Sequence, residues 1–88
     1  MKVYIVQCHE DVSGSPDEVD VYKSLSDACR SYNTSVKTTA EIYGDDNFED
    51  SLIGLKERRK LEGQDVNIEY EVPNGGCTHT INLYSMDI

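Results

Sequence analysis

Cysteine and histidine are the residues of this chain best suited to metal binding or nucleophilic chemistry. Cys77 and His79 would lie on one face of a strand, since one residue separates them, and Cys8 directly precedes His9. Three thiols and two imidazoles suffice for zinc in number, but the sequence lacks C-x-x-C and H-x3-5-H spacings. Cys8 and His9 should also point to opposite sheet faces. We therefore expect no metal site and no cofactor.

A catalytic thiol would need a base and an orienting group beside it. Cys8 or Cys77 could combine with His79 and a carboxylate, but the sequence contains neither G-x-S-x-G nor a phosphate-binding loop. A chain of 88 residues also leaves little room for a substrate pocket. The sequence thus predicts a protein that is not an enzyme.

Charge is the more informative pattern. The chain carries 17 Asp and Glu against 8 Lys and Arg, which gives a formal net charge of -9. The acidic residues gather in two segments, 10–20 and 41–50. Closely spaced carboxylates on a rigid scaffold can occupy a site that another protein uses for phosphates, and they steer association. The residues expected to bind such a partner are, first, Asp45, Asp46, Glu49 and Asp50, and second, Glu10, Asp11, Asp17 and Glu18.

The basic residues allow a different interpretation. Half of them lie within five positions, as Lys56, Arg58, Arg59 and Lys60. They could contact RNA or DNA, with Tyr70 or Tyr84 as a stacking platform. Direct nucleic-acid binding is not favoured, because the rest of the chain is acidic and would repel phosphates. A structural domain whose charges only keep it in solution is the third interpretation.

Hydrophobic periodicity predicts one domain over residues 1–88 with four strands. Strands are expected at about 2–8, 19–23, 66–72 and 78–84, with turns at 9–16 and 73–76. Ser24 should cap a helix that ends near Asn33, and a second helix should run from about Glu49 to Leu61, with Gly54 inside it. Residues 34–47 could extend the first helix or form an extended arm. The order β-β-α-(α)-β-β predicts an α+β fold, a four-stranded antiparallel sheet with helices packed on one face.

Three segments resemble a layout found in small uncharacterised bacterial and phage α+β proteins: 2–6, 21–28 and 82–87. There an N-terminal hairpin ends in an aromatic-x-Ser step, here Tyr22-Lys23-Ser24, continues into a helix with an early Ala, and a terminal strand closes the sheet. These motifs are structural, so the resemblance implies no active site. Residues 36–63 depart from the layout. In size and charge alone, the chain also resembles acidic phage proteins that mimic DNA.

Cellular location and partner follow from the remaining features. No apolar run approaches the roughly 20 residues needed to span a bilayer, and the run after Met1 is too short for a signal peptide. Three cysteines, an odd number, fit a reducing compartment. We expect a cytoplasmic monomer or homodimer that contacts no membrane. It would bind a host protein with a basic surface, as a phage or mobile-element inhibitor of nucleic-acid handling.

Overall fold

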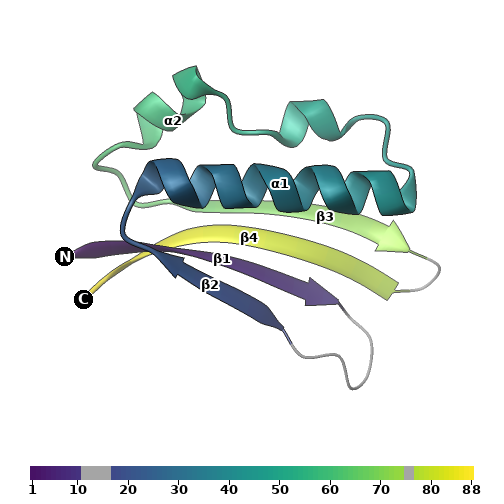
Figure 1. Cartoon of the computed structure of the whole chain (residues 1–88), viewed down its shortest axis with the longest axis horizontal. Helices are drawn as coiled ribbons and strands as arrows, with labels where there is room; N and C mark the ends of the chain where they lie inside the picture. The colour runs from purple at the N-terminus through teal and green to yellow at the C-terminus, as the bar shows by residue number, and fades with distance from the viewer. Residues whose placement is uncertain (11–16, 75–76) are drawn as a thin grey trace.

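A four-stranded antiparallel sheet with one long helix across it forms the structure (Figure 1). This computed structural model describes residues 1–10, 17–74 and 77–88. The strands are β1 (Lys2–Glu10), β2 (Glu18–Tyr22), β3 (Asn67–Asn74) and β4 (Cys77–Asp87), and they lie in the order β2-β1-β4-β3. The predicted α+β class and both predicted hairpins are confirmed, and β1 is central as its apolar sequence indicates.

Alternation along each strand divides the side chains between a covered and an open face. Val6 pairs with Leu83, and Ile81 pairs with Tyr70, and all four belong to the core beneath the helix. Two of these four side chains, Ile81 and Leu83, have no exposed surface. Burying each stabilises the fold by about 1.5–3 kcal/mol. The open face carries Val19, Val21 and Met86, which stay largely exposed around the buried Val3 and Ile5.

Helix α1 (Leu25–Tyr43) is longer than the sequence predicted. The Ser24 side chain caps it by accepting a hydrogen bond from the Asp27 amide at 3.3 Å, as expected. The predicted end near Asn33 is wrong, because the buried stripe continues through Val36 and Ala40. Residues 34–43 therefore extend the helix, which ends at Gly44 in the left-handed conformation, with φ 73°.

The predicted second helix over 49–61 is also wrong as a single element. A 3-10 turn, η1 (Phe48–Ser51), is followed by an extended stretch, and the short helix α2 (Leu55–Leu61) comes after it. Gly54 is the N-cap of α2, with φ -78° and ψ 175°, so it does not weaken a helix interior. Both elements lie on the same side of the sheet as α1 (Figure 1).

Parts of the two predicted turns belong to strands. His9 and Glu10 continue β1, and Pro73 and Asn74 continue β3. The rest of these turns, 11–16 and 75–76, lies outside the described residues, and so does the side chain of Cys77.

Candidate acidic site

The two acidic segments of the sequence meet at one end of the molecule. Glu10 ends β1, Glu18 begins β2, and Asp45 follows the last turn of α1. Figure 1 shows that the ends of β1, β3 and α1 and the beginnings of β2 and β4 share this end. We call the carboxylates gathered there the acidic end: Glu10, Glu18, Glu41, Asp45 and Asp46. The structure thus brings together residues that the sequence separates by more than thirty positions.

Asp45 has a structural role at the acidic end. Its carboxylate accepts a hydrogen bond from the Tyr70 hydroxyl of β3 and another, at 3.0 Å, from the Asn47 amide. Both bonds favour the charged form, so they hold the pKa of Asp45 below its ordinary value, with the Tyr70 bond contributing most. Asp45 therefore ties the chain after α1 to the sheet and has less freedom to meet a partner than the sequence implied.

The other three residues predicted to bind a partner in segment 41–50 are accessible to one. Asp46, Glu49 and Asp50 are exposed, and no ion pair joins them to a cation among the described residues. Asp46 also lines a shallow cleft with Lys37 and Phe48. Glu49 and Asp50 lie on η1, beside the acidic end. These side chains therefore present negative charge to the solvent.

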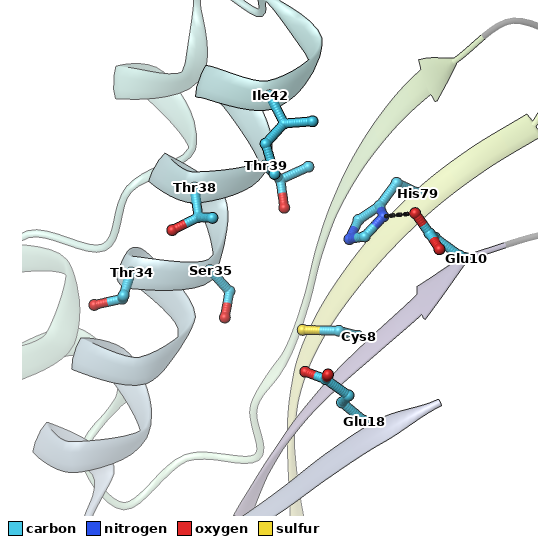
Figure 2. Close-up of a pocket in the computed structure, with 9 residues that line it drawn as sticks. All are labelled: Cys8, Glu10, Glu18, Thr34, Ser35, Thr38, Thr39, Ile42 and His79. Atoms are coloured by element: carbon cyan, nitrogen blue, oxygen red, sulfur yellow. Dashed lines mark hydrogen bonds and ion pairs between the residues drawn. The ribbon is translucent and has the colours of Figure 1, made fainter. Parts of the chain in front are cut away.

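Glu10 and Glu18, from the second predicted group, line a cleft of about 320 Å³ between α1 and the strands (Figure 2). Hydroxyls of α1 form its helical wall, and the strands contribute Cys8 and His79. Glu10 accepts a hydrogen bond from the Tyr43 hydroxyl at 2.9 Å and lies 3.4 Å from His79 Nδ1. Both contacts lower the pKa of Glu10, and the hydrogen bond from Tyr43 contributes most. The cleft is therefore polar and negatively charged.

Two predicted acidic residues do not join this cleft. The Asp17 carboxylate forms a hydrogen bond with the His9 ring and accepts another, at 2.8 Å, from the side-chain amide of Gln7. Both partners lie on the open face of the sheet. The His9 contact is the largest cause of the lowered pKa of Asp17. Asp11 lies outside the described residues.

Cys8 is poorly suited to act as a nucleophile in this cleft. Burial is the largest cause of the raised pKa of its thiol. A hydrogen bond to Ser35 opposes this rise, and the carboxylates of Glu18 and Asp20 each raise the pKa by a smaller amount. Figure 2 shows the Ser35 side chain directed toward Cys8, with Glu18 beside the thiol. A reactive cysteine needs the reverse, a lowered pKa next to a cation. Within the described residues, no three His, Cys, Asp or Glu side chains are grouped to hold a metal ion.

The basic segment lies at the other end of α1. Arg58 of α2 donates a hydrogen bond at 3.0 Å to Ser26, near the start of α1, while Lys56, Arg59 and Lys60 are exposed. Tyr70 is only 5% exposed, so the suggestion that it stacks on bases is wrong, and Tyr84 is half-buried on the open face. The cations and the acidic end are thus separated along the helix.

Two tyrosines organise the acidic end in a way that the sequence did not indicate. Tyr43 and Tyr70 each place a hydroxyl on a carboxylate, and Tyr43 also lies against the His79 ring, with the ring centroids 5.6 Å apart. Tyr70 falls within the strand predicted at 66–72, but nothing in its spacing indicated the Asp45 contact.

Comparison with known proteins assigns no family to this chain. No protein-family model, curated protein or solved structure matches the chain. None of the helices in the described part of the chain has the length and apolar character needed to cross a membrane.

Proposed function

We propose that this chain is a small non-catalytic protein that binds a basic surface of another protein through its acidic end. The acidic end would replace the phosphates of a nucleic acid, so the chain would act as a phage or mobile-element inhibitor of a host protein that handles nucleic acid. No cofactor is required for this role. Charge of this kind raises the rate of association and selects among partners.

The observation that carries the proposal is the placement of negative charge at the C-terminal end of α1. The backbone dipole already makes a helix C-terminus negative, and cations there stabilise a helix while anions destabilise it. α1 is described along its whole length, and its last turn contains no basic residue. Glu41 lies in that turn, and Glu10 and Asp45 lie against it through Tyr43 and the Gly44 cap. Departures from stabilising electrostatics concentrate at functional sites.

The positions of the cations also support a protein partner over a nucleic acid. Four basic residues stand near the start of α1, and one of them, Arg58, is engaged with Ser26. A nucleic acid approaching them would meet the field of a chain with a net charge of -9. A basic protein surface is attracted to the acidic end, and the basic residues of α2 lie too far along α1 to repel it there (Figure 1).

The test is affinity capture from bacterial lysate, with and without nuclease, across a salt titration. The bait is compared with the Asp46→Lys/Glu49→Lys/Asp50→Lys variant, which reverses one carboxylate of the acidic end and the two carboxylates of η1, the element that follows it in the chain. A matched control, Asp27→Lys/Glu62→Lys/Asp87→Lys, changes the net charge equally at exposed positions away from the acidic end.

We expect one nucleic-acid-binding protein to be recovered with or without nuclease, to be released at high salt, and to be lost only with the first variant. Circular dichroism would verify that both variants fold. If both variants lost the partner equally, the interaction would depend on net charge and not on the acidic end, and the proposal would be contradicted. Capture that vanishes with nuclease would assign the binding to Lys56, Arg58, Arg59 and Lys60 instead.

A further inference from the structure

A second pocket lies between η1, α2 and the edge strand β3, away from the cleft of Figure 2. Its volume is about 470 Å³, within the usual range for sites that hold small organic molecules. Its apolar wall consists of Leu52, Ile53, Leu61 and Ile68. Exposed charged side chains surround it, namely Asp50, Glu57, Lys60 and Glu69.

Tyr32 of α1 also lines this pocket, and it is the observation that points to a ligand. The residue has 0% exposure, and its buried hydroxyl has no hydrogen-bond partner among the described residues. Buried polar groups are rarely left unpaired, so an orphan hydroxyl at a pocket calls for an explanation. Burial raises the pKa of Tyr32 to about 12, so the hydroxyl stays neutral and can both donate and accept a hydrogen bond.

Tyr32 and Glu69, which belong to different elements, both line this pocket. The Glu69 carboxylate contributes to the raised pKa of Tyr32, and Glu69 lines the same pocket. The two elements that flank the pocket, η1 and α2, contain no buried residue. A ligand can therefore reach the hydroxyl by displacing half-buried side chains of the cover, such as Leu52 and Leu61.

The charges at the pocket mouth select the sign of the ligand. Three carboxylates, from Asp50, Glu57 and Glu69, surround it with a single ammonium, from Lys60. An organic cation gains attraction at this mouth, and an organic anion is repelled.

We infer that this pocket binds a small organic amine whose apolar body carries a hydroxyl group. The apolar body would pack on Leu52, Leu61 and Ile68, the hydroxyl would pair with the Tyr32 hydroxyl, and the ammonium would remain at the carboxylates of the mouth. This site goes beyond the proposed function, and it does not require a protein partner.

Three commercially available probes separate these contributions. Tyramine has the aromatic body, the hydroxyl and the ammonium; phenethylamine lacks the hydroxyl; 3-(4-hydroxyphenyl)propionate replaces the ammonium with a carboxylate. Binding is followed by NMR titration of the backbone amides of the full chain. For ligands of this size we expect roughly millimolar dissociation constants. Tyramine should bind about three- to tenfold more tightly than phenethylamine, since one hydrogen bond is added. The propionate should bind most weakly.

Variants then assign the effect to the pocket. Tyr32→Phe keeps the ring and should reduce the affinity for tyramine to that for phenethylamine, while the affinity for phenethylamine stays unchanged. Leu61→Trp should fill the pocket and abolish binding of both amines. Leu55→Trp is the matched control on the same helix, because Leu55 is 55% exposed and lies outside the pocket lining.

Three results would overturn the inference. The first is the absence of amide shifts around the pocket at millimolar tyramine, which would mean that solvent alone occupies it. The second is an undiminished affinity of Tyr32→Phe for tyramine. The third is propionate binding as tight as tyramine binding. None of these results depends on whether the acidic end binds a protein, because no protein partner is present in the assay.

Discussion

Replacing Asn33 by Ala should detach the η1–α2 segment from α1 and destabilise the whole fold. The Asn33 side chain donates a hydrogen bond to the Ile53 carbonyl and accepts one from the Ile53 amide, each at 2.8 Å. It therefore satisfies both backbone groups of one residue, and Ala would leave them unpaired near the core. Two such bonds contribute about 1–3 kcal/mol together. The better helix propensity of Ala offsets roughly 0.5 kcal/mol of that loss.

We expect the free energy of unfolding to fall by about 0.5–2.5 kcal/mol, which lowers the melting temperature by roughly 2–20 °C for a domain of this size. Urea denaturation measures the change. Thr34→Ala is the matched control, because Thr34 is exposed and, among the described residues, its hydroxyl bonds only to the Arg30 carbonyl one turn earlier. Hydrogen exchange at the Ile53 amide should accelerate in the Asn33 variant alone. An unfolding free energy no lower than that of Thr34→Ala would refute the bridging role.

Two further predictions concern the end of α1. Gly44→Ala should cost about 1 kcal/mol in thermal unfolding because φ is 73° there, whereas Gly54→Ala, at φ -78°, should cost less, since the added Cβ meets only the movable end of Glu57. If the two variants lost the same amount of stability, the left-handed conformation of Gly44 at the end of α1 would be contradicted. The Tyr70 bond lowers the pKa of Asp45 in the folded chain. The stability that this bond contributes is therefore fully present above pH 3.8, the ordinary pKa of Asp, and is lost as the pH falls through the lower pKa of the folded chain. Acid titration should therefore show the stability difference between the native chain and Tyr70→Phe shrinking below pH 3.8, and a constant difference would exclude the linkage.

The strands were predictable from sequence because their signal is local. Period-two alternation and β-branched residues identified all four, and the short connection between the first two predicted their antiparallel pairing. The helical region was harder. Asn33, Thr34 and Ser35 have low helix propensity, but Asn33 bonds to Ile53, a contact that only the folded chain supplies. Gly54 fits the periodicity of a continuous helix, yet it begins α2 after an extended stretch.

The candidate site was predictable in composition and not in arrangement. Charge counts identified the acidic segments, but they could not separate Asp45, which Tyr70 holds, from Asp46, which has no ion-pair partner in the described part of the chain. The convergence of Glu10 and Asp45 depends on the strand order and on the length of α1, and the second of these was mispredicted. The buried hydroxyl of Tyr32 gave no signal, because a tyrosine on the apolar face of a helix has the spacing of an ordinary core residue.

The pairing of β1 with β4 has a consequence for folding. The two central strands come from opposite ends of the chain, with Glu10 and His79 69 positions apart, and Met1 and Ile88 exchange backbone hydrogen bonds. Joining these ends and opening the chain at Gly63, between α2 and β3, would place the strands in the order β3, β4, β1, β2. That order is a simple meander in which every neighbouring pair is consecutive. The native connectivity is a circular permutation of it, and the permuted chain, with its lower contact order, should fold faster to the same sheet.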